Sequence, residues 1–378
     1  MQSEAASEAI TVAEWAFGSL LQRPELFAVA VIAVLFAAAI WWYLRPTASD
    51  RFVDTLSDYD RVAVLMHPNP DPDAMASALG VSALSSAIET HTVVQYPGEI
   101  RHPENRAFET VLDCEFGRIE RADDIGADAV VLVDHNEPRG FEGAETIDPV
   151  AIVDHHPGDG EGSIFTDIRT ERGSCASIVT DYIRERGWSN RVNTDGRSLT
   201  PVLSTALLYG IQSDTTSFTR SCTQAEFEAA AYLFPAADPD ALDRIANPQV
   251  DSETLEIKAR AITDRTVEGS FLVSHVGEVS NLDSLSVAAE ELVRLEGITA
   301  AVITGECDGN IHVSGRSRDD RVHMGKAVSK ALSAIPDANA GGHARMGGGR
   351  AMLPVWVPNC NGRAELQGRL FDAMNGEL

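Results

Sequence analysis

Residues 61–77 read RVAVLMHPNPDPDAMAS: an apolar segment, a proline-rich polar turn and the start of a helix. Similar apolar segments follow at 91–96 (HTVVQY), 128–134 (DAVVLVD) and 150–156 (VAIVDHH), and a helix is expected over 73–88. Short aliphatic runs that alternate with amphipathic stretches are typical of a parallel β-sheet covered by helices. We therefore predict an α/β domain with a parallel sheet over residues 50–237.

Acidic and imidazole side chains stand where these apolar segments end. They are His67, Asp71 and Asp73 after the first segment, Asp134 after the third, Asp154, His155 and His156 after the fourth, and Asp214 in LYGIQSDTTSF (208–218). Ligands bind at the carboxyl ends of the strands in such sheets, and oxygen ligands with some imidazole suit Mn²⁺ or Mg²⁺. Helix capping could explain Asp73 alone, and a turn could explain Asp134 alone. The repetition favours a metal site.

A second, smaller domain is expected after a linker at 238–251, which contains Pro239 and Pro248. Residues 252–378 mix strand-like segments (SFLVSHV, AAVITGE and NIHVSGRS) with helices expected near 285–295 and 324–332. This pattern predicts a mixed α/β fold.

The N-terminal region predicts a membrane anchor. Residues 26–44, LFAVAVIAVLFAAAIWWYL, follow an acidic segment over 1–25 and carry no charge. As a helix they would span about 28 Å. The aromatic end of this run and the arginines after it predict a single-pass cell-membrane protein whose catalytic domains face the cytoplasm. The acidic leader and the length of the run argue against a cleaved signal peptide.

The charge is strongly acidic. Asp and Glu number 57 against 30 Lys and Arg, which gives a net charge of −27, and only Lys258, Lys326 and Lys330 are lysines. Concentrated salt shortens the Debye length to about 3 Å at 1 M and relieves such repulsion. We infer a salt-loving source and no binding of duplex DNA. The 5 cysteines are scattered and indicate neither a zinc cluster nor a disulfide framework.

These motifs, together with GGHARMGGG at 341–349, resemble the DHH phosphoesterase superfamily with its DHHA1 partner domain, from about Arg61 onward. The chain most resembles a branch with nano-RNases and cyclic di-AMP phosphodiesterases, here from a halophilic archaeon. The resemblance implies two divalent ions, with Mn²⁺ favoured and Mg²⁺ or Co²⁺ as alternatives. His67, Asp71 and Asp134 would hold one ion; Asp73, Asp134, His155 and Asp214 would hold the other, with Asp134 as the bridge. Catalytic roles fall to His156, facing the substrate phosphate, and to Asp154, orienting a ligand histidine.

The resemblance also implies how substrate is held. The second domain would grip a short nucleotide through Arg316, Arg318 and the Gly341-Gly342-His343 loop, because arginine forks and glycine backbones suit phosphate oxygens. The expected function is membrane-anchored hydrolysis of linear di-adenylate or nano-RNA, cyclic di-AMP or 3′-phosphoadenosine 5′-phosphate. A homodimer is the default expectation.

Two other functions stay open. Asp-His-Asn-Glu at 134–137 also resembles family II inorganic pyrophosphatases, although their Ser-Arg-Lys-Lys motif is absent and GRSR stands at 315–318. A non-catalytic, membrane-bound nucleotide sensor belongs to a different class. All six expected ligand positions still carry Asp or His, which argues against it.

Overall fold

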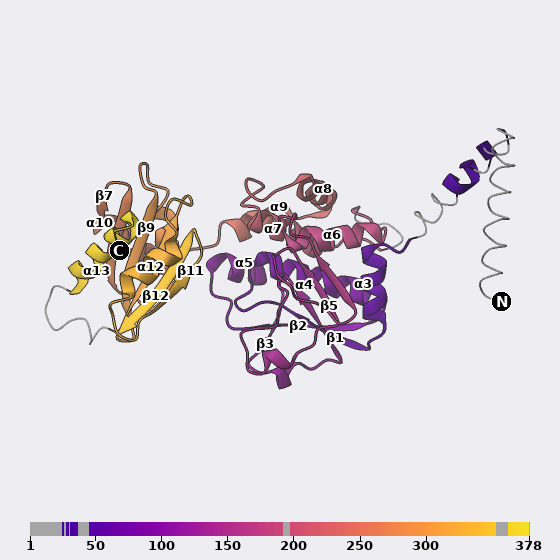
Figure 1. Cartoon of the computed structure of the whole chain (residues 1–378), viewed down its shortest axis with the longest axis horizontal. Helices are drawn as coiled ribbons and strands as arrows, with labels where there is room; N and C mark the ends of the chain where they lie inside the picture. The colour runs from indigo at the N-terminus through magenta and orange to yellow at the C-terminus, as the bar shows by residue number, and fades with distance from the viewer. Residues whose placement is uncertain are drawn as a thin grey trace, which may run out of the picture. The chain divides into compact units, whose positions relative to one another are not determined.

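The computed structural model describes residues 25, 28–29, 31–36, 45–191, 197–352 and 362–377. It divides into two compact units, one drawn from 1–99 and 114–242 and the other from 100–113 and 243–378 (Figure 1). The predicted linker at 238–251 contains a helix, α9 (Pro239–Ala246). The domain boundaries given above stay a prediction.

The first unit is built on a six-stranded parallel sheet in the order β3-β2-β1-β4-β5-β6. Its strands are β1 (Arg61–Leu65), β2 (His91–Pro97), β3 (Gly117–Ile119), β4 (Ala129–Val133), β5 (Ala151–Asp154) and β6 (Phe165–Ile168). The central strand β4 is buried along its whole length, as its aliphatic run predicts for a covered parallel sheet. The strand order reverses between β1 and β4, where such sheets open a crevice at the strands' carboxyl ends.

Helices of this unit place the polar turns at that crevice. They are α3 (Ala48–Ser57), α4 (Pro72–Ser86), α6 (Cys175–Glu185), α7 (Pro201–Asp214), α8 (Gln224–Leu233) and α9, with short 3₁₀ turns at Ala122–Asp124, Ala144–Thr146 and Phe234–Ala236. Asp71 caps the N-terminus of α4, and Pro72 begins it. Helices α4, α6 and α7 pack on one another, and glycines allow this close approach. A Cβ on Gly210 would lie 2.8 Å from the Ala76 Cβ and 3.1 Å from the Pro72 oxygen.

Replacing Gly210 with alanine should therefore destabilise the first unit, although alanine favours helices. The added methyl group would push α7 away from α4, and such overpacking costs about 1–3 kcal/mol. Urea denaturation should show an earlier unfolding midpoint. Gly126→Ala is the matched control because its new Cβ meets nothing within 4 Å. Equal midpoints for the two variants would contradict the tight contact.

The second unit has a mixed sheet in the order β11-β12-β10-β9-β8-β7, in which β8 and β9 are parallel and the other pairs antiparallel. The strands are β7 (Thr266–Glu268), β8 (Phe271–Glu278), β9 (Ala300–Cys307), β10 (Asn310–Ser317), β11 (Asn339–Gly342) and β12 (Met346–Met352); the helices are α5 (Pro103–Leu112), α10 (Ser252–Thr263), α11 (Asp283–Leu292), α12 (Met324–Leu332) and α13 (Gly362–Asn375). Successive residues of β9 point to opposite faces of the sheet and pack into two different hydrophobic cores. Val302 packs with α12 and α13, and Ile303 packs with α10 and α11. The predicted α/β class, with a parallel sheet followed by a mixed one, is confirmed.

The expected transmembrane helix is not supported and is corrected. Within the part of the chain that the structure describes, no helix is long and apolar enough to cross a bilayer. Of the predicted span 26–44, only 28–29 and 31–36 are described; the remainder, like residues 1–24, lies outside the described residues. The prediction rested on the sequence pattern alone, which is an uncharged apolar run that ends in aromatic residues and is followed by arginines. The predictions of a single-pass membrane location and of the membrane as a partner depended on this helix and are not supported either.

Candidate metal centre

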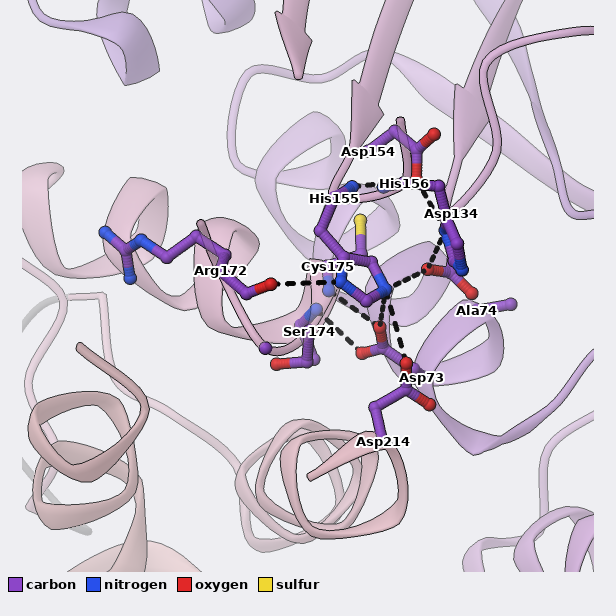
Figure 2. Close-up of polar contacts among 12 residues, drawn as sticks. Asp73, Ala74, Asp134, Asp154, His155, His156, Arg172, Ser174, Cys175 and Asp214 are labelled. Atoms are coloured by element: carbon purple, nitrogen blue, oxygen red, sulfur yellow. Dashed lines mark hydrogen bonds and ion pairs between the residues drawn. The ribbon is translucent and has the colours of Figure 1, made fainter. Parts of the chain in front are cut away.

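The carboxyl ends of β1, β4 and β5 bring the predicted ligands together. His67 lies two residues beyond β1, Asp134 directly follows β4, and His155 directly follows β5. Helix termini supply the others: Asp71 and Asp73 lie at the start of α4, and Asp214 is the last residue of α7. Figure 2 shows His155 at the centre, with contacts to Asp73, Asp134 and Asp214.

Asp134 lies between the two histidines and is only 1% exposed. One carboxylate oxygen is 3.4 Å from the Nε2 of His67, and the other is 3.3 Å from the Nε2 of His155. Neither oxygen has a hydrogen-bond partner. Because a buried carboxylate without hydrogen bonds is costly, this arrangement needs cations beside it.

Backbone carbonyls orient both imidazoles. The Nδ1 of His67 donates to the Pro68 oxygen at 3.0 Å, and the Nδ1 of His155 donates to the Arg172 oxygen at 3.2 Å. This fixes the tautomer and points each Nε2 at the carboxylates. Such a second contact is the usual support for a histidine that binds metal.

Backbone amides hold two of the remaining carboxylates, Asp71 and Asp73. Asp73 is fully buried and accepts from the amides of Cys175 and Ala176, at 2.6 and 2.8 Å, at the N-terminus of α6. Asp71 accepts from the amide of Ala74 and turns its other oxygen to within 3.6 Å of the His67 Nε2. The Oδ2 of Asp214 lies 3.2 Å from the His155 Nε2. The amides thereby preorganise Asp71 and Asp73.

Three sets of side chains each offer ligand atoms within 4.8 Å of one another. They are His67, Asp71 and Asp134; Asp73, His155 and Asp214; and Asp134, His155 and His156. Carboxylate oxygen with imidazole nitrogen suits Mn²⁺ and related divalent ions. The donor set and the unpaired oxygens of Asp134 together fit divalent cations.

The cluster perturbs its own protonation. Burial alone would lower the pKa of His67, but Asp134 and Asp71 outweigh it and raise this pKa to about 11. Burial likewise opposes the charge of His155, whose pKa Asp134 and Asp214 raise to about 12. Burial and the neighbouring acids hold the pKa of Asp73 well above its ordinary value. The two imidazolium groups thus serve as internal counterions of the carboxylates when no metal is bound.

Asp154 and His156 form a separate pair beside the cluster. One oxygen of Asp154 accepts from the His156 Nδ1 at 3.0 Å and from the amides of His155 and His156. Its other oxygen accepts from the Asn136 Nδ2 at 2.7 Å. Asp154 is fully engaged, and it orients the ring of His156; the ring of His155 is held by Arg172. His156 itself is half-exposed, and the hydrogen bond that its Nδ1 donates to Asp154 raises its pKa.

The second unit holds the expected substrate residues in two places. Arg316, Gly341 and Gly342 line a groove of about 490 Å³ along β10, β11 and β12. The guanidinium of Arg316 pairs with Glu290 at 2.9 and 3.0 Å. Arg318 and His343 are exposed and do not line this groove. Gly342 has a φ of 138°, and a Cβ there would meet the Met346 oxygen at 2.3 Å, so the loop requires glycine.

Several residues that support the site were not predicted. Asn136 joins the Asp134 and Asp154 turns, and the Arg172 carbonyl holds His155. His135, next to Asp134, is buried, and burial lowers its pKa to about 4. Asn136 and His135 adjoin a quoted motif, but the role of the Arg172 carbonyl leaves no trace in the sequence.

Comparisons with known proteins agree with this geometry. Residues 61–211 match the DHH family, N-terminal domain, and residues 268–354 match the DHHA1 domain. The chain thus contains a DHH-family N-terminal domain and a DHHA1 domain. A solved structure, an exopolyphosphatase-related protein from Bacteroides fragilis, shares the fold at a TM-score of 0.68 and 14% identity, over 87% of this chain and 96% of that one.

Curated relatives carry different names. An uncharacterised protein of Methanocaldococcus jannaschii is 34% identical over 74% of this chain and 55% of its own length. A probable manganese-dependent inorganic pyrophosphatase of Bacillus cereus is 27% identical over 65% of this chain and 78% of its own. The cyclic-di-AMP phosphodiesterase PdeA of Listeria monocytogenes is 24% identical over 71% of this chain. The chain spans 55% of the first of these proteins and 42% of the Listeria protein.

Proposed function

We propose that the chain is a metal-dependent phosphoesterase that hydrolyses phosphodiester bonds of short nucleotides. The observation that carries this proposal is the convergence of three carboxylates and two histidines on Asp134, whose buried oxygens lack hydrogen bonds. The DHH and DHHA1 domains and a relative named as a cyclic-di-AMP phosphodiesterase support it. Linear di-adenylate or nano-RNA and cyclic di-AMP are the candidate phosphodiesters, as in the nano-RNase and cyclic di-AMP branch. The remaining candidate substrate, 3′-phosphoadenosine 5′-phosphate, would lose a phosphate from a phosphomonoester.

We propose two divalent ions, with Mn²⁺ favoured and Mg²⁺ or Co²⁺ as alternatives. His67, Asp71 and Asp134 would hold one ion, and Asp73, Asp134, His155 and Asp214 the other. A relative named as manganese-dependent supports the choice of Mn²⁺. Bound ions of this kind lower the pKa of a water and neutralise charge on phosphoryl oxygens.

The chain's own groups would do the rest. The Nδ1 of His156 donates a hydrogen bond to Asp154. The Nε2 of this half-exposed ring would then be available to donate to a phosphoryl oxygen. The raised pKa of His156 favours the protonated ring, which donates a charge-assisted hydrogen bond. In the second unit, Arg316 and the backbone of Gly341 and Gly342 would bind the nucleotide. Arg318 and His343 remain proposed contacts, although they lie outside the groove lining.

An inorganic pyrophosphatase is the second candidate. Asp-His-Asn-Glu at 134–137 and the Bacillus relative favour it. The lining of the groove in the second unit includes glycines, Arg316 and Arg350 but no lysine, which favours a nucleotide over pyrophosphate. The third candidate, a non-catalytic nucleotide sensor, would not need the preorganised carboxylates.

Parallel assays distinguish these functions. The full chain would be incubated with Mn²⁺ in molar salt with linear di-adenylate, cyclic di-AMP, 3′-phosphoadenosine 5′-phosphate or pyrophosphate. Molar salt suits the net charge of −27, from which we propose a halophilic archaeon as the source. We expect AMP release from a nucleotide substrate. Cleavage of pyrophosphate alone would identify a pyrophosphatase, and binding without turnover a sensor. Homodimer formation and failure to bind duplex DNA stay predictions.

A further inference from the structure

Glu226, on α8, is a fully buried carboxylate outside the cluster described above. Its Oε2 accepts from the amide and hydroxyl of Thr223 at 2.7 and 2.6 Å. Its Oε1 accepts from the Gly173 amide at 3.0 Å and the Ser177 hydroxyl at 2.9 Å. Burial would raise the pKa of Glu226, but these hydrogen bonds outweigh it and lower the pKa. Helix capping explains the contacts with Thr223 and leaves those with Gly173 and Ser177 unexplained.

The turn that Glu226 grips, residues 172–177, holds two of the proposed metal ligands. The carbonyl of Arg172 accepts from the His155 ring, and the amides of Cys175 and Ala176 donate to Asp73. Figure 2 shows the contact between the Arg172 carbonyl and the His155 ring, with Ser174 and Cys175 of the same turn labelled. Glu226 binds this turn between those contacts, at the Gly173 amide, and again beyond them, at the Ser177 hydroxyl. A shift of the turn would therefore move His155 and Asp73 together.

The other oxygen of Glu226 binds Thr223, which comes directly after the segment that follows Asp214. This segment, 215–222, leads to Thr223 and contains Thr216, Ser217, Phe218 and Ser221, all with φ between 48° and 62°. Left-handed backbone at residues other than glycine persists only where its surroundings hold it. A Cβ on Gly173 would lie 2.3 Å from the Ser221 oxygen, so the turn and the segment are in contact. Glu226 joins them through its two oxygens.

We propose that Glu226 is a positioning residue for one of the two metal sites, the set of Asp73, His155 and Asp214. The other set depends on different contacts, because His67 is oriented by Pro68 and Asp71 by Ala74. The hydrogen bonds described above for Glu226 and for the turn 172–177 involve neither His67 nor Asp71. This inference rests on the proposed function only in taking two ions as bound.

A Glu226→Gln variant tests the asymmetry, because glutamine keeps the shape but turns one acceptor oxygen into a donor that faces other donors. The full chain would be titrated with Mn²⁺ alone, by calorimetry and by electron paramagnetic resonance of free Mn²⁺. We expect two sites in the wild type. In the variant one of them should weaken by about 10- to 100-fold, the usual effect of removing support behind a ligand. The other site should keep its affinity.

Glu228→Gln is the matched control, since Glu228 is exposed on the same helix and should leave both sites unchanged. Ser177→Ala removes a single donor to Glu226 and should weaken the same site to a smaller extent; it decides the matter if Glu226→Gln does not fold. The proposal would be overturned if circular dichroism showed the variant to be folded and the Mn²⁺ affinity were unchanged at both sites. An equal loss of affinity at both sites would also overturn it. Wild-type protein that binds two Mn²⁺ without hydrolysing any substrate would refute the proposed function and leave this inference standing.

Discussion

The Asp134→Asn variant should hydrolyse the nucleotide substrate more than about 100-fold more slowly than the wild type. Removing a residue that only supports a metal ligand costs up to about 100-fold, and Asp134 is proposed to bind the metal itself. Asp134 faces both His67 and His155, so a neutral amide there would weaken both proposed metal sites at once. Asparagine is the right replacement because Asp134 has a φ of 63°, a conformation that asparagine adopts far more readily than alanine. The initial rate of AMP release under saturating Mn²⁺ measures the effect.

Asp308→Asn provides the control for this substitution. Asp308 also has a left-handed backbone, with a φ of 49°, but it lies in the turn between β9 and β10 of the second unit. The same chemical change there should leave the rate unaltered. If Asp134→Asn kept most of the wild-type rate, the site described here would not be the site of hydrolysis.

Mn²⁺ binding should release at least two protons per chain near neutral pH, because a metal ligand histidine must be neutral, and Asp73, whose pKa is also raised, can add to this number. With pKa values of about 11 and 12, His67 and His155 carry protons in the metal-free chain. Mn²⁺ therefore competes with protons, and its affinity should rise with pH. Loss of two protons corresponds to a change in the apparent binding constant of about 100-fold per pH unit. Calorimetric titrations in buffers with different protonation enthalpies count the protons directly.

The metal should also stabilise the folded chain. A ligand present at 1,000 times its dissociation constant adds about 4 kcal/mol to the free energy of unfolding. Thermal denaturation should show a higher midpoint with Mn²⁺ than with a chelator, and this difference should shrink as the pH falls. Binding without proton release would mean that the imidazoles do not take part.

Much of the first unit is predictable from local sequence. The strand-like run before His67 and those before Asp134 and His155 each end in a polar turn, and parallel strands bring those turns to one edge. The helix at α9 was missed because Pro239 was interpreted as part of a linker. Proline is equally suited to the first turn of a helix, and the Asp238 carboxylate accepts there from the amides of Asp240 and Ala241.

Support for the ligands was less accessible from sequence. Asp73 binds the amides of Cys175 and Ala176, about a hundred positions later, and His155 binds the carbonyl of Arg172. Backbone donors and acceptors are the same at every residue, so only the tertiary fold reveals them. Glu226 follows Thr223 in a capping pattern that predicts the start of a helix, and nothing local links it to Gly173. The apolar run at 26–44 shows the opposite case, in which a clear local pattern predicts an element, a transmembrane helix, that the described residues do not support.

Anomalous X-ray diffraction at the manganese absorption edge, on crystals of the chain grown with Mn²⁺, tests the central claim most directly. We predict two peaks per chain, one among His67, Asp71 and Asp134 and the other among Asp73, Asp134, His155 and Asp214. Peaks elsewhere, or none beside Asp134 when the crystals contain Mn²⁺, would contradict the account.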